Sequence, residues 1–237
     1  MSFGRSRRLL PFLICFSLVP AVQAQISAQS PPSSSSSKPG MKTAAATATE
    51  IDSGSVSNGV YRNKSLALSC TIPPGWVLRT DEMNARDEKR KEEEKDKADA
   101  AKGSPAPASS EGAKVLLAAF SRPPEAKGED VNSSILIVAE SAAAYPGLKE
   151  AAQYFGPLIE VAKAQGFTME EDPYDIAIGN KTLVRGDFHK DVASRVMRQS
   201  TLAMLAHGYA ISITVIGGTD DEVEDLVDGL SFSTSAK

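Results

Sequence analysis

The stretch TLVRGDFHKDVASRVMRQSTLAMLAHGYAISITVI, residues 182–216, decides the fold class. It holds three runs of strand-forming residues, 182–188, 195–206 and 209–216, and the dipeptide His207-Gly208 between the last two favours a tight turn. The last run is apolar at both sets of alternating positions, which is typical of a strand whose two faces are covered. The sequence therefore predicts an antiparallel meander whose last strand lies near the centre of a sheet.

Shorter strand pairs precede the meander. Residues 59–63 and 66–72 predict a hairpin, and the turn residues that follow it lead into a strand at residues 76–78. Residues 115–120 and 135–140 predict a second strand pair, joined by a polar loop. The chain is therefore rich in strands on both sides of residue 100.

Two segments show helical periodicity. Apolar residues recur at three- and four-residue spacing from Leu148 to Ala162, so an amphipathic helix is predicted over residues 147–165. Thr219 and Glu222 have the spacing of a capping box and open a closing helix that runs to Leu230. Together the elements predict an α+β fold in which helices pack on the faces of a curved antiparallel sheet.

The N-terminal region predicts export. Residues 1–24 combine a basic start, an apolar run and small residues at the end, and the run is shorter than the roughly 20 residues of a membrane span, so a cleaved signal peptide is predicted. Residues 25–57 are rich in Ser, Ala, Thr and Pro, which predicts a disordered tether. We therefore expect an exported protein, periplasmic or extracellular, with no stable membrane span after signal cleavage.

The remaining chain predicts one domain, residues 58–235. Residues 81–112 interrupt it with a run of mixed charge followed by Gly, Ser, Pro and Ala, which predicts a solvated, partly disordered insertion that starts as a helix; a partner-binding helix is the alternative. Without the signal peptide, 23 Lys and Arg stand against 30 Asp and Glu, so the net charge changes from −4 to −7. This acidic balance argues against nucleic-acid binding.

One group of potential metal ligands stands out. Asp187, His189 and Asp191 alternate along an extended segment, so their side chains leave one face and offer a nitrogen and two carboxylates to a divalent metal. A solvated strand end is the alternative interpretation, because the strand is expected to end near Phe188 and Arg185 occupies the same face.

Other reactive residue types do not form a catalytic pattern. Cys70 is the single cysteine that remains after signal cleavage, so no intramolecular disulfide is possible, and its alternating apolar surroundings predict a buried thiol. Ser194 and Ser200 lack the G-x-S-x-G turn of a hydrolase nucleophile. Gly217-Gly218-Thr219 lacks the lysine of a phosphate-binding loop. The sequence predicts neither an enzyme nor a bound cofactor.

The elements follow one another in a particular order: Gly59–Asn63, Ile72–Trp76, the predicted helix 147–165, Arg195–Ala206, Tyr209–Thr214 and Val227–Phe232. This succession resembles the PsbP-like superfamily of α/β/α sandwich proteins. The superfamily includes extrinsic photosystem II subunits, a nuclear Ran-binding relative and many uncharacterised exported bacterial proteins, and this chain resembles the exported bacterial branch. The resemblance implies a non-catalytic binding or assembly role and no transferable site residue.

These observations predict an exported, non-catalytic binding or assembly module with a protein partner at the cell envelope. Two alternatives stay open. One is a metal-dependent enzyme or metal-binding protein that uses Asp187, His189 and Asp191. The other is a carrier that holds a small molecule in an apolar cleft between sheet and helix. The sequence leaves the oligomeric state open.

Overall fold

The computed structural model describes residues 51–100, 113–126, 128 and 130–233. The predicted signal peptide, the predicted tether up to residue 50 and the end of the charged insertion, residues 101–112, lie outside the described residues. In the part of the chain that is described, no helix is long and apolar enough to cross a membrane.

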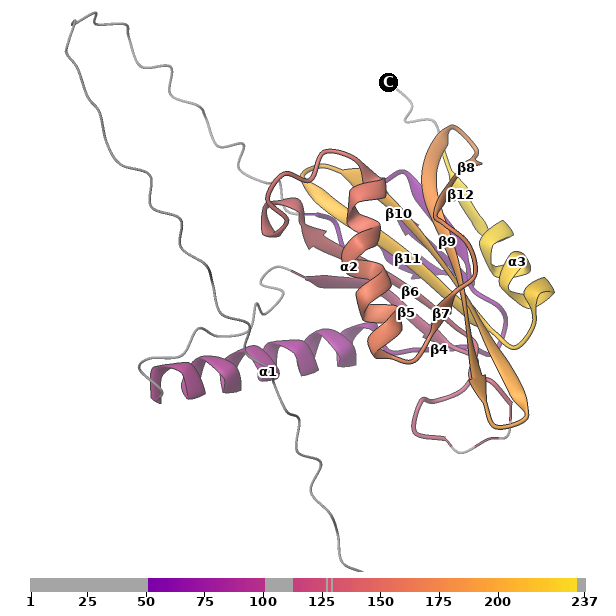
Figure 1. The fold of residues 1–237 in the computed structure, drawn as a ribbon, viewed down its shortest axis with the longest axis horizontal. Helices are drawn as coiled ribbons and strands as arrows, with labels where there is room; N and C mark the ends of the chain where they lie inside the picture. The colour runs from indigo at the N-terminus through magenta and orange to yellow at the C-terminus, as the bar shows by residue number, and fades with distance from the viewer. Residues whose placement is uncertain (1–50, 101–112, 127, 129, 234–237) are drawn as a thin grey trace, which may run out of the picture. The chain divides into compact units, whose positions relative to one another are not determined.

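An eight-stranded sheet forms the centre of the fold (Figure 1). Its strand order is β4-β5-β6-β11-β10-β9-β7, and β8 pairs with β9 beside β7. Every pairing is antiparallel, and β11 lies between β6 and β10, which confirms the predicted meander and the inner position of its last strand. The strands are β4 (Val77–Leu78), β5 (Lys114–Phe120), β6 (Ser134–Ser141), β7 (Thr168–Met169), β8 (Tyr174–Ile178), β9 (Lys181–Val192), β10 (Arg195–Ala206) and β11 (Tyr209–Gly217).

A second, four-stranded sheet with the order β1-β2-β3-β12 was not predicted. The predicted hairpin is present in it, but Leu230, expected at the end of the closing helix, begins strand β12 and pairs with Cys70. The predicted tether boundary at residue 57 is also wrong, because Ile51 is buried in the core and β1 pairs with β2. The strands are β1 (Ser55–Ser57), β2 (Val60–Asn63), β3 (Leu68–Thr71) and β12 (Leu230–Phe232).

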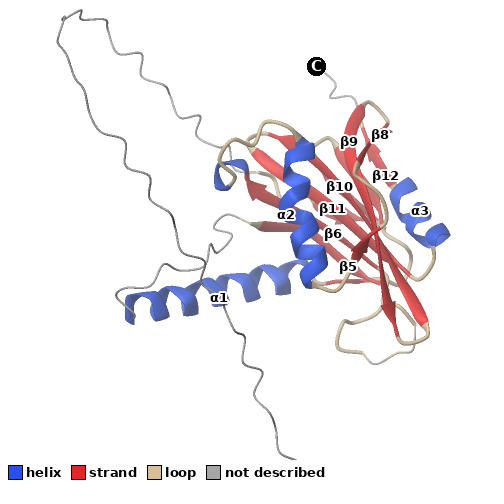
Figure 2. Cartoon of the chain, viewed as in Figure 1, coloured by secondary structure: helices blue, strands red, loops and turns tan. Residues whose placement is uncertain are grey.

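Three α-helices and one short 3-10 helix, η1 (Ala142–Ala144), complete the described fold (Figure 2). Helix α1 (Thr80–Ala100) occupies the start of the predicted insertion, and the flanking strands β4 and β5 pair with each other. Helix α2 (Ala151–Ala164) begins four residues later than predicted, because Glu150 and Gln153 form a capping box there. Helix α3 (Asp220–Asp228) starts after Thr219, whose hydroxyl accepts a hydrogen bond from the Glu222 amide.

Two apolar cores lie on opposite sides of the main sheet. One core joins the main sheet to the second sheet and to α3, through residues such as Leu226. The other joins the main sheet to α2, where a Cβ atom on Gly186 would lie 2.6 Å from the ring of Phe155. Adjacent residues Leu202 and Ala203 of β10 belong to one core each, as the alternation of a strand requires. The structure is therefore an α+β fold with α2 on one face of the sheet and α3 on the other.

Candidate functional site

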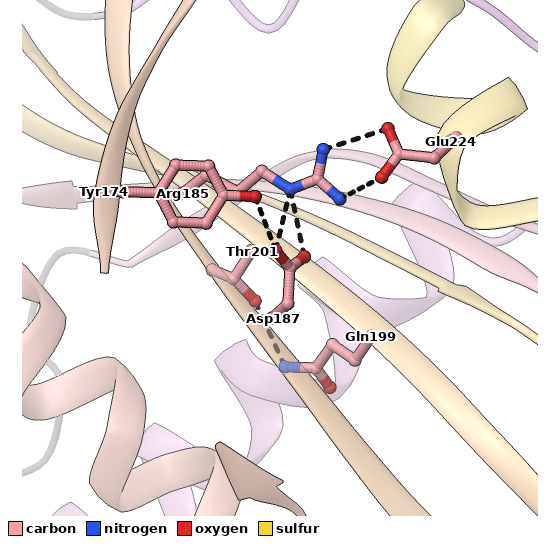
Figure 3. A network of polar contacts seen from close by, with 6 residues as sticks. All are labelled: Tyr174, Arg185, Asp187, Gln199, Thr201 and Glu224. Carbon is pink, nitrogen blue, oxygen red and sulfur yellow. Dashed lines mark hydrogen bonds and ion pairs between the residues drawn. The ribbon is translucent and has the colours of Figure 1, made fainter. Parts of the chain in front are cut away.

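The candidate site centres on Arg185, a buried cation in strand β9 (Figure 3). Its Nε donates to both carboxylate oxygens of Asp187, at 3.0 and 3.1 Å. Its two terminal nitrogens donate to the two carboxylate oxygens of Glu224 on α3, one of them at 3.0 Å. One guanidinium therefore ties the sheet to the helix that covers it.

The position of Arg185 explains why it needs two carboxylates. It stands opposite Leu202 on the neighbouring strand, on the sheet face that α3 covers, and it is 8% exposed. A buried charge is costly unless it is paired and hydrogen-bonded. Burial by itself lowers the pKa of Arg185, but the hydrogen bonds and charges of Glu224 and Asp187 outweigh this effect and leave the pKa above its ordinary value.

Tyr174 adds a third element to the network. Its hydroxyl, on the edge strand β8, donates to Asp187 Oδ2 at 2.8 Å. Burial, followed by the hydrogen bond and the charge of Asp187, raises the pKa of Tyr174 to about 12, although nearby Arg185 acts in the opposite direction. Both oxygens of Asp187 thus already accept hydrogen bonds from protein groups.

Charged side chains surround a depression of about 230 Å³ next to this network. Glu170, in the loop before β8, lies 2.7 Å from Arg198 and 3.3 Å from His189 Nδ1, the latter without the geometry of a hydrogen bond. Arg198 also lies 3.3 Å from Asp220, the first residue of α3. The depression is lined by Glu170, Glu171, Tyr174, Arg185, Asp187, Phe188, Arg198, Gln199, Asp220, Val223 and Glu224. Carboxylates therefore outnumber cations around it.

The three predicted metal ligands share a face of β9 but do not form a ligand group. The expectation that the strand ends near Phe188 is wrong, because β9 continues to Val192 and so carries Asp187, His189 and Asp191 at alternating positions. No three or more His, Cys, Asp or Glu side chains within the described ranges are placed to hold a metal ion. Asp187 is instead engaged by Arg185 and Tyr174, and Asp191 is exposed near the hairpin tip.

The other singled-out residues have structural positions. Cys70 is fully buried, as predicted, and burial raises the pKa of its thiol to about 12. Ser200 is also fully buried, and Ser194 is exposed in the turn after β9. His207 lies in the predicted turn, where its Nε2 is 2.7 Å from the Ser65 carbonyl oxygen. Gln199 donates to Thr201 on the same strand at 3.1 Å, separately from the Arg185 network (Figure 3).

The N-terminus of α3 is filled by the protein's own carboxylate. Glu222 accepts a hydrogen bond from the Gly218 amide at 2.8 Å and another from the Ser133 hydroxyl, which it meets at close range. A helix N-terminus attracts anions, and here a side chain takes that place. The Gly218 amide is therefore engaged by a carboxylate of the chain itself.

The space between α2 and the sheet is occupied by side chains. Tyr154 and Phe155 of α2 pack with Phe188 of β9 and Phe167 in a buried cluster. The apolar cleft that a small-molecule carrier would use is therefore filled at this place by aromatic rings of the chain.

Sequence reasoning missed Arg185, Tyr174 and Glu224 as site residues. A signal for Arg185 was present, because it is the single cation in the strand-forming run 182–188 and needs acidic partners once it is buried. The partner Glu224 lies 39 residues further along the chain and could not be identified without the packing of α3.

Comparisons with known proteins give only distant similarities. No protein-family model and no curated protein match the chain. Among solved structures, the chain is similar to the Ran-binding protein Mog1p of Saccharomyces cerevisiae, at 10% identity and a TM-score of 0.37 over 70% of this chain and 90% of that one. It is also similar to LpqN, involved in cell envelope biogenesis of Mycobacterium tuberculosis, at 12% identity and a TM-score of 0.33 over 70% and 83%.

A third solved structure is a protein of unknown function and putative regulator, PA94 from Pseudomonas aeruginosa. Its identity is 18% and its TM-score 0.31, over 43% of this chain and 68% of that one. Likeness at these scores carries no argument about function. Membership of the PsbP-like superfamily stays a prediction.

Proposed function

We propose that the protein is an exported, non-catalytic binding module that holds a protein partner at the cell envelope by a basic segment of that partner. The observation that supports this function is an acidic surface formed by α3 and the loop before β8. It consists of Glu170, Glu171, Asp220, Asp221, Glu224, Asp225 and Asp228, all exposed. A surface of one sign attracts a partner of the opposite sign and guides its approach.

Two carboxylates of this surface lie where they do not stabilise helix α3. Asp225 and Asp228 lie in the second half of α3, whose last turn has no basic residue. Carboxylates near the C-terminus of a helix oppose the helix dipole, each at a cost of about 0.3–1 kcal/mol. Charges kept at a local cost to the helix are typical of positions that serve binding.

The surface is also partly free of internal partners. Within the described residues, Glu171, Asp221, Asp225 and Asp228 make no salt bridge, whereas Glu224 and Asp220 contact Arg185 and Arg198. The Arg185 network fixes α3 on the sheet, so the unpaired carboxylates are presented on a rigid support. A prearranged surface loses little entropy when a partner binds.

We further propose that residues 1–24 direct export and are removed, and that the domain is a distant PsbP-like fold of curved sheet and covering helices. The basic, apolar and small-residue segments of the N-terminus support export. The order of strands and helices, with α2 and α3 on opposite faces, supports the fold proposal.

The binding proposal is tested by cross-linking the exported chain in its own cell envelope and measuring the affinity of any captured partner. The neutralised variant Asp221→Asn/Asp225→Asn is compared with Glu88→Gln/Glu160→Gln, which removes two exposed charges from α1 and α2. We expect the first variant to bind at least about tenfold more weakly, and the wild type to lose affinity as salt is raised.

The matched control should bind like the wild type. Equal affinity of both variants and the wild type would refute the acidic surface as the binding site. The absence of any saturable partner in repeated captures would count against the binding function itself.

Export is tested separately by fractionating cells and measuring the intact mass of the chain. The proposal requires a product that begins at Gln25 and lies outside the cytoplasm. A full-length product in the cytoplasm would contradict it.

A further inference from the structure

We propose that the first two turns of α1 close the outer edge of strand β5, and that opening this edge lets β5 pair with β5 of a second copy of the chain. The inference is independent of the acidic surface and of the proposed function. It rests on four backbone groups of β5 and on the groups that satisfy them.

Asn84 behaves like a strand partner for Val115. Its side-chain nitrogen donates to the Val115 carbonyl oxygen at 2.9 Å, and its side-chain oxygen accepts from the Val115 amide at 3.0 Å. The same two groups would exchange bonds with a residue of a neighbouring antiparallel strand. One carboxamide therefore occupies a complete pairing position on the edge of the sheet.

The next outward-facing backbone groups of β5 belong to Ala118, three residues on, because the pairing of β5 with β6 shifts register between Val115 and Leu117. Thr80 and the backbone of Arg79 close this position. The Thr80 hydroxyl accepts from the Ala118 amide at 2.9 Å, and the Arg79 amide donates to the Ala118 carbonyl oxygen at 2.8 Å. Thr80 and Asn84 are four residues apart, so they lie on one face of α1 and reach two points along the strand. Beyond Ala118, β4 pairs with the end of β5.

The closed edge is strongly apolar. Between Val115 and Ala119 every side chain of β5 is buried, and the segment reads VLLAA. An uncovered apolar edge strand readily accepts another strand. The edge is also identical in every copy, so two copies can pair in antiparallel register about a two-fold axis, and each supplies the surface that the other needs.

The cover is held by polar contacts rather than by an apolar face. From Asp81 to Arg90, α1 contains one large apolar residue, Met83. A side-chain hydrogen bond that exchanges with water contributes only about 0.5–1.5 kcal/mol. The first turns of α1 are therefore expected to leave the edge at a modest cost, whereas strands buried on both faces stay in place.

The test compares the wild type with Thr80→Ala/Asn84→Ala by analytical ultracentrifugation over a range of concentrations. The variant removes the three side-chain bonds to β5 and keeps helix-forming residues. The matched control, Arg86→Ala/Glu88→Ala, changes two exposed residues of the same helix and leaves the net charge unchanged. We expect self-association of the variant to be at least about tenfold tighter than that of the wild type and of the control.

Amide hydrogen exchange locates the contact. In the variant, the Val115 and Ala118 amides should exchange fast at low concentration and become protected as the dimer forms. Association without this concentration-dependent protection would overturn the proposal, and so would a folded variant that stays monomeric with fast-exchanging amides. If the double variant does not fold, Asn84→Ala alone, which keeps the Thr80 bond, is measured instead. It must show a smaller increase in self-association and in amide exchange.

Discussion

The two edges of the main sheet differ in length, in side-chain polarity and in what covers them. On one side, β5 is seven residues long and apolar, and β4 and the side chains of α1 cover it. On the other side, β8 has five residues, exposes Tyr174 and Asp175, and pairs only with β9 in the described part of the chain. An edge that is short and carries charge is already a poor template for another strand, whereas a long apolar edge needs a cover.

The edges also differ in how they are held. On the β8 side, the buried charge of Arg185 binds the carboxylates of Asp187 and Glu224, and the hydroxyl of Tyr174 also binds Asp187. The β5 side is closed by neutral hydrogen bonds at a partly buried position. Because a broken charge network leaves an unpaired ion behind, we expect the β8 side to be the more sensitive of the two to single substitutions.

The largest effect is expected at Arg185. The variant Arg185→Met leaves the mostly buried carboxylate of Asp187 without its cation. The side chain of Glu224 is 52% exposed, so water solvates its carboxylate instead. We expect a loss of about 2–4 kcal/mol in the free energy of unfolding, measured by urea denaturation. Arg62→Met, at an exposed position of β2, serves as the control and should cost less than about 0.5 kcal/mol. Equal stability of the two variants would show that the network does not hold this side of the sheet.

A direct comparison of the edges uses Asn84→Ala and Asp175→Ala. The first leaves the Val115 amide and carbonyl groups without their side-chain partner, and we expect a loss of about 1–2 kcal/mol in urea denaturation. The second removes an exposed side chain from the open edge and should change stability by no more than about 0.5 kcal/mol. A greater loss for Asp175→Ala would reverse the distinction between a covered edge and an open one.

The smallest effect is expected at high pH on the β8 side. Tyr174 has a pKa of about 12 in the folded protein and about 10 when unfolded. A group whose pKa is raised by folding stabilises the folded state below its unfolded pKa, and this contribution is lost as the pH rises from about 10 to about 12. Stability should therefore fall over this range, and less steeply in Tyr174→Phe.

The measurement is the urea midpoint of both proteins at several pH values in that window. Tyr61, whose pKa burial also raises to about 12, contributes to the fall in both proteins, so the difference between them reports Tyr174. Parallel curves would contradict a role of Tyr174 in the pH dependence.

Much of the main sheet could be predicted because its signals are local. The predicted strand 195–206 agrees with β10 at both ends, since the turn His207-Gly208 limits it and the preceding residues favour strands. The end of β9 was misjudged because the polar residues after Phe188 resemble a loop. They remain in strand conformation because they pair with the first residues of β10. Pairing between neighbouring strands outweighed the local pattern there.

The second sheet and the site depended on distant parts of the chain. Strand β12 has three residues, too few for a periodic pattern, and it becomes a strand through its pairing with β3. The Arg185 network likewise joins β8, β9 and α3, and the Asn84 contact joins residues 31 positions apart. No local sequence pattern predicts which of these segments contact one another in the fold.

The sequence by itself determined the α+β class, the antiparallel meander, the buried thiol of Cys70 and the acidic balance of the chain, because periodicity, turn residues and composition act over a few residues. Only the tertiary structure decided that the described strands form two sheets, that Arg185 binds Asp187 and Glu224, and that α1 covers the edge of β5. These features arise because buried charges and unpaired backbone groups must find partners, and those partners come from whichever segments the packed core brings near.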